Sequence, residues 1–589
     1  MNRHCRSDCR VRRNGFRLRA IAWLVLLALT PLCIVRAEPA LTLAVEGVDG
    51  AFRDNVLAHL GQPASLDAAV IARYLRAAPA RIDAAMQALG HYHAEVELVL
   101  DDAVDPPALT VIIDRGEPTR IRSADVRITG PGSADPALTE QAARLTPPVG
   151  AVLNHGAYQR LIRSLQTQAL QHGYLDARFE TRQIRVAREE READIVVHYA
   201  SGPRYPFGDV RFGDIPLDPR LLRGLQPFTP GDPYDAALVT QFNRNLLQSG
   251  YFETVRVASQ PASADLVDGV PVQADLQLQP ANTISVGGGF STDVGPRGRL
   301  TWQRPYVTMT GHALDTDIEI AQRRQSAEIG YRIPLDPPLQ RRLEFSTGVE
   351  SRQQDDTDAT RLSVGVRLQW LLANDWDASV FSRLERERFE QAGVDGRTTL
   401  LLPGVSLGRV RSRGSPDPSW GDRQFLSLEG ARSELASDLN LLRVRASSAW
   451  LRSLGDFRLH LRSEVGLMET ARVDALPPSL RFFAGGDRSV RGYAYRSLGP
   501  RNANDALIGG RYLLTGSAEI DYPVREQWRL AVFTDAGNAF DDWGTSLKQG
   551  AGFGVRRSTP LGPIRLDLAW AVSEPARPFR AHLSIGLNL

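Results

Sequence analysis

Two short stretches of the sequence carry residue types that enzymes use. Residues 404–408 read GVSLG, the spacing in which hydrolases expose a nucleophilic serine, here Ser406. Such a serine needs a strand, a sharp turn and then a helix, whereas the residues around it keep alternating between polar and apolar. Residues 287–290 read GGGF, but a phosphate-binding loop continues with Lys and Ser or Thr, and the only lysine is Lys548. We therefore predict strands at both places and no enzymatic activity.

The first 37 residues have the pattern of a secretory signal peptide. Seven arginines precede an apolar stretch from Ala20 to Val35, and small residues at Val35-Arg36-Ala37 suit cleavage after Ala37. The segment holds eight of the 70 Lys and Arg but one of the 68 Asp and Glu, so the remaining chain is slightly acidic. The mildly basic whole-chain balance is therefore no sign of nucleic-acid binding.

Cysteine and histidine usage argues against metal and cofactor chemistry. All three cysteines, Cys5, Cys9 and Cys33, lie in the predicted signal peptide, so the exported chain has no thiol to ligate a metal or form a disulfide. The ten histidines are scattered rather than spaced as ligands. We predict no metal site and no cofactor. A thiol-free exported chain of this length suits a bacterial envelope protein.

One further stretch has unusual chemistry, because residues 481–500 read RFFAGGDRSVRGYAYRSLGP between two predicted strands. Almost forty residues without regular periodicity separate the strand ending near Ala471 from the one starting near Gly510, and connections of that length are usually functional. Arg491 carries a permanent charge and needs a carboxylate if it leaves bulk water. Glu519 and Asp535 lie on the polar faces of the two strands downstream. We predict that the loop folds inward and places Arg491 between them, with Gly492 permitting close approach and Tyr493 packing on the wall.

The second half of the chain, from residue 283, is predicted to consist of strands. Apolar and polar residues alternate in one segment after another, and in residues 579–589 the apolar set is Phe579, Ala581, Leu583, Ile585, Leu587 and Leu589. This pattern predicts an outer-membrane β-barrel with about 14–18 strands, apolar outside and polar inside. A soluble β-sandwich alternates as well, and it is the alternative reading of the fold.

The first half is predicted to contain three similar α+β modules. A helical segment ends in glycine and an aromatic-containing strand follows at Gly90, Gly173 and Gly250. Each module reads strand, helix, helix, strand, strand. We place the boundaries near Pro118, Pro206 and Asn282, which divides the chain into 1–37, 38–118, 119–206, 207–282 and 283–589.

The C-terminal segments resemble the barrel of the BamA/TamA superfamily. The quoted loop contains Val490-Arg491-Gly492-Tyr493, which is similar to the family's Val/Ile-Arg-Gly-Phe/Tyr motif in the sixth extracellular loop, and Phe533, Asp535 and Gly537 match its Phe-x-Asp-x-Gly pattern. The resemblance implies three periplasmic POTRA domains followed by a 16-stranded antiparallel transmembrane barrel. Three POTRA units, rather than five or two, favour the TamA branch.

The resemblance also implies a function and its partners. Members assemble or insert outer-membrane proteins, autotransporters included, and a TamB-like inner-membrane-anchored protein is expected to contact the POTRA array at the first unit. Unfolded outer-membrane proteins and outer-membrane lipid would be the other partners. The family mechanism uses a weak seam between the first and last strands, where Gly287, Gly288, Gly289 and Gly586 would weaken pairing. The chain departs from the family in ending with Leu589 instead of an aromatic residue. A two-partner-type secretion pore, a BamA-like insertase and a periplasmic scaffold are the alternative functions.

Overall fold

The computed structural model describes residues 41–585 apart from 105, 261–267, 355, 415–417, 474 and 560–562. The predicted signal peptide and the predicted seam residue Gly586 therefore lie outside the described residues. The chain divides into two compact units, residues 1–204 and 205–589. In the described ranges, no helix combines the length and apolar character needed to cross a membrane.

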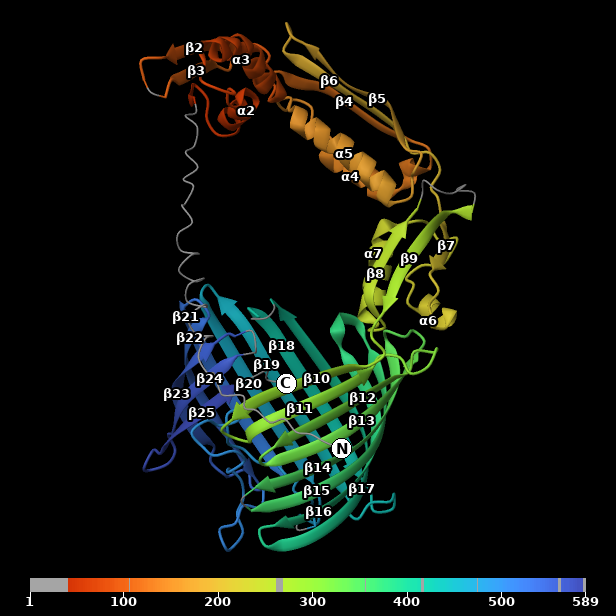
Figure 1. Cartoon of the computed structure of the whole chain (residues 1–589), viewed down its shortest axis with the longest axis vertical. Helices are drawn as coiled ribbons and strands as arrows, with labels where there is room; N and C mark the ends of the chain where they lie inside the picture. Colours follow the sequence, from red (N-terminus) through yellow and green to blue (C-terminus); the bar gives the residue numbers. More distant parts are fainter. Residues whose placement is uncertain are drawn as a thin grey trace, which may run out of the picture. The chain divides into compact units, whose positions relative to one another are not determined.

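The first unit contains two small α/β modules. In the first module, α2 (Ala51–Leu60) and α3 (Ala68–Ala88) follow β1 (Thr42–Glu46) and cover a sheet in the order β1-β3-β2, completed by β2 (Glu95–Asp101) and β3 (Ala108–Asp114). Strand β1 runs parallel to β3. Val56, Ile82 and Leu109 are fully buried between the helices and the sheet. The order strand, helix, helix, strand, strand agrees with the sequence-based prediction (Figure 1).

The second module repeats this order with longer strands. Its elements are β4 (Arg120–Thr129), η1 (Pro131–Ala134), α4 (Pro136–Leu145), α5 (His155–Gln171), β5 (Arg178–Ala187) and β6 (Glu192–Ala200), and the sheet order is β4-β6-β5. Helix α5 starts where Asn154 accepts a hydrogen bond from the Ala157 amide at 2.9 Å, a standard N-cap. Leu161 and Leu165, one turn apart, then bury the same face against the sheet.

The second unit opens with a third small sheet of the same kind. Its elements are β7 (Phe207–Phe212), α6 (Pro219–Gly224), α7 (Ala236–Gln248), β8 (Phe252–Ser259) and β9 (Val270–Leu278), in the order β7-β9-β8. Within this unit the module is hydrogen-bonded to the barrel: the Tyr251 hydroxyl donates to the Gly311 carbonyl at 3.0 Å, and the Asp218 amide donates to the Met309 carbonyl at 2.8 Å.

The rest of the second unit is a closed antiparallel barrel in which sixteen strands pair in sequence order (Figure 1). The prediction of a barrel is thereby confirmed, and the soluble sandwich is wrong. The strands are β10 (Thr283–Ser291), β11 (Gly295–Arg304), β12 (Ala313–Ala321), β13 (Arg324–Leu335), β14 (Arg341–Gln354), β15 (Thr357–Leu371), β16 (Asp377–Gln391), β17 (Val394–Arg413), β18 (Trp420–Ala431), β19 (Leu441–Leu454), β20 (Phe457–Glu469), β21 (Tyr512–Arg525), β22 (Trp528–Phe540), β23 (Lys548–Arg557), β24 (Ile564–Ala571) and β25 (Phe579–Ile585).

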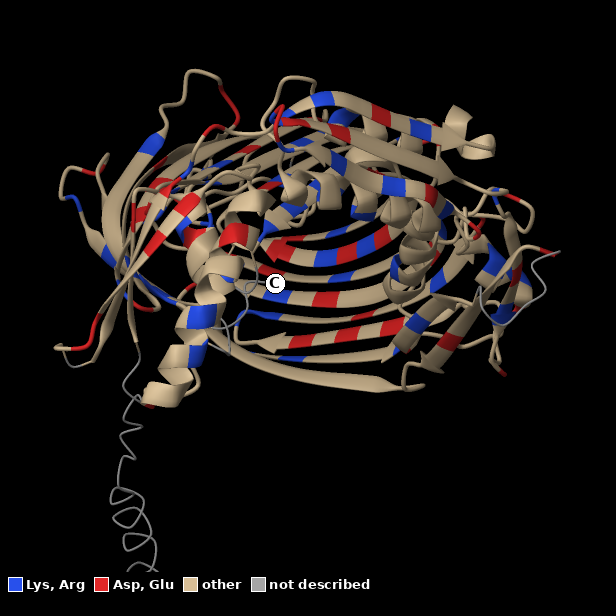
Figure 2. Cartoon of the chain, turned by 90° about the horizontal axis from the view of Figure 1, so that it is seen from above, with Lys and Arg blue, Asp and Glu red and all other residues tan. Residues whose placement is uncertain are grey.

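The two faces of the barrel wall have opposite character. On β22, Leu530 and Val532 are exposed on the outside, whereas the intervening and following residues Ala531, Phe533 and Asp535 are buried inside. Figure 2 shows acidic and basic residues recurring along the barrel strands. Ser406 lies inside β17, and its hydroxyl is 2.8 Å from that of Ser379. The GVSLG stretch is thus a strand, as predicted, and the next described element after it is another strand, β18.

Candidate functional site: an arginine clamp in the barrel and the adjoining seam

The connection between β20 and β21, loop 470–511, folds back into the barrel. Apolar side chains hold it there: Leu480, Phe482 and Val490 are buried in one cluster with Leu400 and Leu402 of β17. Tyr493 belongs to the same cluster. The loop also pairs with itself, since Phe482 bridges to Gly510 and Ala484 to Leu498. Burial of this apolar surface positions the charged residues that lie between the aromatic ones.

Arg491 is the centre of the charged site, and its side chain is only 4% exposed. Its backbone amide and its Nε donate to Asp535 Oδ2 at 3.0 and 2.8 Å, and a terminal nitrogen donates to Asp535 Oδ1 at 2.9 Å. The other terminal nitrogen donates to Glu519 at 2.6 Å. The guanidinium carbon lies 3.4 Å from the centroid of the Phe533 ring. The structure therefore brings Arg491, Glu519 and Asp535 together, as the positions of their faces led us to expect.

A second arginine extends this site across the wall. Arg556 of β23 donates to Glu519 at 2.9 Å and to Asp567 of β24 at 2.5 Å, and Asp567 is 3.4 Å from Arg491. We call these five residues the arginine clamp: Arg491, Arg556, Glu519, Asp535 and Asp567. Burial lowers the pKa of Arg491, but hydrogen bonds and charges from Asp535, Glu519 and Asp567 outweigh it and raise that pKa above its usual value. The arginine is permanently charged and fully paired.

Glycines let the loop backbone reach the wall. Gly492 has φ +95°, a conformation that other residues rarely adopt, and a Cβ there would lie 2.8 Å from the carbonyl carbon of Trp570. Gly550 of β23 faces the Arg491 carbonyl oxygen so closely that any side chain would collide with it. Gly537, the last residue of the predicted Phe-x-Asp-x-Gly pattern, leaves room for the Leu514 carbonyl, 2.7 Å from the position of a Cβ.

Loop 470–511 also reaches both terminal strands of the barrel. The Gly492 amide donates to His582 Nε2 of β25 at 3.1 Å. The Asp487 amide donates to Asp293, just after β10, at 2.8 Å, and His582 Nδ1 lies 3.8 Å from the same carboxylate. Burial, together with the Asp293 carboxylate, raises the pKa of Asp487 to about 6. The loop therefore bridges the first and last strands of the barrel at one end of their junction.

The junction of β10 and β25, which we call the seam, is described at the end near Asp293. There Phe290 pairs with Ile585 and Ser291 with Ser584. Val286 is 80% exposed on the outer face of β10. A Cβ added at Gly287 would meet no atom within 4 Å. A Cβ added at Gly288 would lie 4.0 Å from one backbone atom, the carbonyl oxygen of Arg297. At Gly289 a Cβ would lie 2.9 Å from the Ile585 carbonyl oxygen, so this glycine permits close approach of the two strands instead of merely weakening them.

Sequence reasoning missed several members of the site. Asp567 and Arg556 lie on alternating strands whose polar faces were recognisable, but nothing in the pattern tied them to Arg491. Asp293 and Asp487 are 194 positions apart in sequence. Their meeting depends on the closure of the barrel. The polar face of β25 was the available signal for His582.

One group of described residues has the spacing of a metal site: His460, Glu519 and Asp521. Asp521, however, already accepts hydrogen bonds from Arg458 Nε at 3.0 Å and from His460 at 2.6 Å, and it is also bonded to Arg529. Two guanidinium groups beside the carboxylate oppose a cation there. The arrangement fits a luminal ion-pair network.

Comparisons with known proteins match both halves of the chain. Residues 308–588 match the Omp85 superfamily domain, and residues 42–115 match the first POTRA domain of TamA. The chain is 21% identical over 471 residues to the outer membrane protein assembly factor BamA of Neisseria meningitidis, covering 66% of this chain and 56% of that protein. It is 34% identical over 128 residues to the chloroplastic outer envelope protein 80 of Arabidopsis thaliana, covering 20% and 16%.

A solved structure shares the fold. BamA from Haemophilus ducreyi lacking POTRA domains 1–3 superposes with a TM-score of 0.67 at 14% identity, covering 79% of this chain and 99% of that one. The chain spans about half the length of the curated BamA relatives it matches, 46 to 56%.

Proposed function

We propose, from the premise that this chain belongs to the Omp85 superfamily, that it assembles or inserts outer-membrane proteins through the seam between β10 and β25. The observation that carries the proposal is the glycine run of β10: Gly287, Gly288 and Gly289 stand next to Phe290 and Ser291, which pair with β25. Glycines weaken a strand interior, and a strand edge that parts from its neighbour is a template for another strand. An incoming substrate strand would pair with that edge by β-augmentation.

The clamp supports this proposal because it holds the loop while the wall opens. Asp535, Glu519, Arg556 and Asp567 belong to β21–β24, and together they fix Arg491 without any contribution from β10. Separation of β10 from β25 would leave these hydrogen bonds intact. The lumen would then stay plugged while the outer wall admits a strand.

The finer assignment is to the TamA branch. The match of residues 42–115 to the first POTRA domain of TamA supports it, as do the three small sheets of similar order. On this assignment residues 38–118, 119–206 and 207–282 are three periplasmic POTRA domains, and the first contacts a TamB-like inner-membrane-anchored protein. The substrates include autotransporters. Co-purification of such a partner with the full chain, and its loss when residues 38–118 are deleted, would test the partner.

The seam is tested by locking it. Phe290 and Ile585 are directly opposite in register, and antiparallel partners lie within the Cα distance that a disulfide needs. The native cysteines are confined to residues 1–37. We expect Phe290→Cys/Ile585→Cys to lose insertion of an unfolded outer-membrane protein into proteoliposomes when oxidised and to regain it with reductant.

A matched control locks two interior strands. Phe345→Cys/Val366→Cys joins opposite, outward-facing residues of β14 and β15. This variant should insert substrate equally well in both redox states. Full insertion by the oxidised seam variant would contradict the proposal.

A further inference from the structure

The outer wall of the barrel carries a group of arginines at one end of β17. Arg409, Arg411 and Arg413 lie on the same face of β17 as Val405, because side chains alternate along a strand. Val405 is exposed, and its register partner Leu428 of β18 is exposed as well. Apolar neighbours on that face identify it as the lipid-facing side. Because consecutive strands reverse direction, the β17–β18 connection lies at the same end of the barrel as Thr283, which follows the third small sheet. This is the periplasmic end.

These arginines surround one buried carboxylate and several indole rings. Asp422, whose side chain is 0% exposed, is 2.8 Å from Arg411, 3.3 Å from Arg409 and 3.9 Å from Arg452 of β19. We call these residues and the tryptophans on which they stack the Arg–Trp cluster. The guanidinium carbon of Arg409 lies 4.5 Å from the ring centroid of Trp376, and that of Arg413 lies 4.8 Å from Trp420. The guanidinium carbon of Arg452 lies 4.6 Å from Trp420 and 4.8 Å from Trp450.

The Arg–Trp cluster has donors in excess. Three guanidinium groups face a single carboxylate and a fourth, that of Arg413, stacks on Trp420 beside them, whereas in the arginine clamp two guanidinium groups face three carboxylates. Two buried donors of the cluster have no acceptor among the described residues. They are Arg409 Nε and the side-chain nitrogen Nε2 of Gln424, which is the register partner of Arg409. Arginine forks match phosphate oxygens, and tryptophan prefers the membrane surface. Charge on a lipid-facing strand is costly at mid-membrane but nearly free at headgroup depth.

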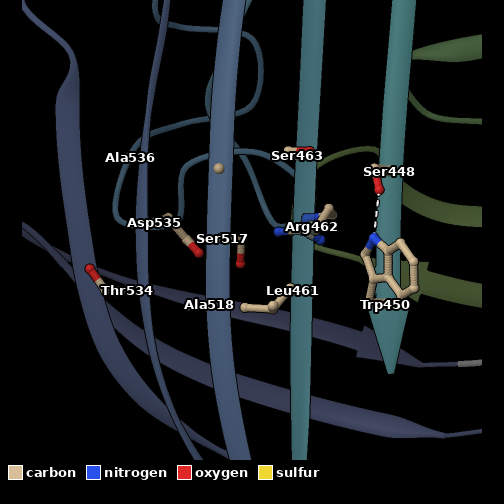
Figure 3. Close-up of a pocket in the computed structure, with 11 residues that line it drawn as sticks. Ser448, Trp450, Leu461, Arg462, Ser463, Ser517, Ala518, Thr534, Asp535 and Ala536 are labelled. Carbon is tan, nitrogen blue, oxygen red and sulfur yellow. Dashed lines mark hydrogen bonds between the residues drawn. The ribbon is translucent and has the colours of Figure 1, made fainter. Parts of the chain in front are cut away.

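A hollow adjoins the cluster on the same face. It has a volume of about 480 Å³ and is shown in Figure 3. Ser448, Ser463, Gly516 and Ala536 form a row of register partners across β19–β22, so no side chain larger than serine fills that row. Trp450 lies at the edge of the hollow and donates to the Ser448 hydroxyl at 2.7 Å. Trp450 is also opposite Asp422 in register, so it joins the hollow to the cluster.

We propose that the Arg–Trp cluster and the hollow bind one phospholipid from the periplasmic surface of the membrane. The phosphate is held by the guanidinium groups that surround Asp422, and one acyl chain lies over Trp450 in the hollow. Charge complementarity selects a phosphate-bearing lipid, and the adjoining apolar depression selects a lipid over a soluble anion. This site lies outside the barrel and does not depend on the proposed assembly function.

The test measures lipid retained by the full chain in detergent, using native mass spectrometry without any substrate. The probes are dioleoylphosphatidylglycerol, dioleoylglycerol, which has the same chains without phosphate, and inorganic phosphate. We expect dioleoylphosphatidylglycerol to bind. The double variant Arg411→Gln/Arg413→Gln should weaken its affinity roughly tenfold, the effect of losing one or two charge-assisted hydrogen bonds. Arg413→Gln alone, which leaves every measured contact of Asp422 in place, should weaken it less.

Matched controls separate the site from general lipid adhesion. Arg557 stacks on Trp528 at 5.1 Å at the same end of the barrel, and Arg557→Gln should bind phosphatidylglycerol like the wild type. In the hollow, Ser463→Leu should weaken binding, whereas Val465→Leu, two residues along the same face of β20, should not. The proposal would be overturned if dioleoylglycerol bound as well as dioleoylphosphatidylglycerol, or if inorganic phosphate displaced the bound phospholipid. Unchanged phospholipid binding by the double arginine variant would overturn it as well.

Discussion

The arginine clamp holds loop 470–511 against the barrel wall and the seam joins the first and last strands, and the two do so with opposite chemistry. The clamp gathers five charged side chains that are 0 to 12% exposed, and each of its two arginines contacts carboxylates on more than one strand. The seam offers glycines, two described register pairs and an exposed Val286. Removing one member of a buried charged network is costly, whereas glycine-rich strand edges lose little on parting. On the proposal that the wall opens at the seam, this difference leaves the loop docked while the two strands part.

The strongest way to break this contrast is to remove the central arginine. Arg491→Ala leaves the buried carboxylates of Asp535, Glu519 and Asp567 without their shared partner, at a cost on the order of 3–5 kcal/mol. We expect loop 470–511 to become sensitive to trypsin, which would cut at Arg488 and Arg496. Arg491→Lys restores the charge without the fork and should give an intermediate rate. Wild-type protease resistance in Arg491→Ala would show that the apolar cluster alone docks the loop.

A smaller effect is expected where the loop backbone meets the wall. Gly492→Ala places a Cβ against the Trp570 backbone at a positive φ, and strain of this kind costs about 1–3 kcal/mol. The variant should undock the loop partially, seen as faster proteolysis at unchanged barrel stability on heat-modifiable gels. Gly516→Ala is the control, because a Cβ there has nothing within 4 Å. Equal behaviour of the two variants would remove Gly492 from the docking argument.

The seam should respond to substitution at two neighbouring glycines with opposite signs. Gly287→Val meets open space and adds strand propensity, so it should raise the heat-modifiability midpoint by an amount corresponding to at most about 1 kcal/mol. Gly289→Val collides with the Ile585 carbonyl and should lower the midpoint. If both variants raise it, close approach at Gly289 is not what holds the described part of the seam.

The smallest effect concerns pH at the bridge between loop and seam. The pKa of Asp487 is raised to about 6 by burial and by Asp293, so its contribution to docking is present at low pH and is lost as pH rises through about 6. Burial raises the pKa of Asp293, but the nearby His582 and the hydrogen bonds with Asp487 outweigh it and lower that pKa. Asp293 therefore responds in the opposite sense and reduces the net change.

Asp487→Asn removes the titrating group at this bridge. We expect it to slow proteolysis of the loop at pH 7.5, to have a smaller effect at pH 5, and to leave the rate at about pH 4, near the unfolded pKa, close to that of the wild type. A loop that becomes more sensitive at pH 7.5 would mean that the Asp487 charge stabilises docking.

Local pattern was enough to predict most of the elements. The alternation of Leu530 and Val532 with Phe533 and Asp535 indicated which face of β22 is outside, and the glycines at positions 90, 173 and 250 marked helix ends, where each has a positive φ. The partners of Arg491 on β21 and β22 followed from the same alternation, because faces are set by a period of two. Asp567 and Arg556 did not follow, since alternation gives a residue its face but not its distance from a loop.

The sequence by itself determined that the chain has strands with an apolar outer face, a long polar loop between two of them, and an arginine that requires carboxylates if buried. Only the tertiary structure decided which carboxylates it meets, that Asp487 and Asp293 face each other, and that Arg409, Arg411 and Arg452 gather around Asp422. The physical reason is that faces follow from local periodicity, whereas closure and register of a barrel are global. They bring together side chains that no local spacing relates.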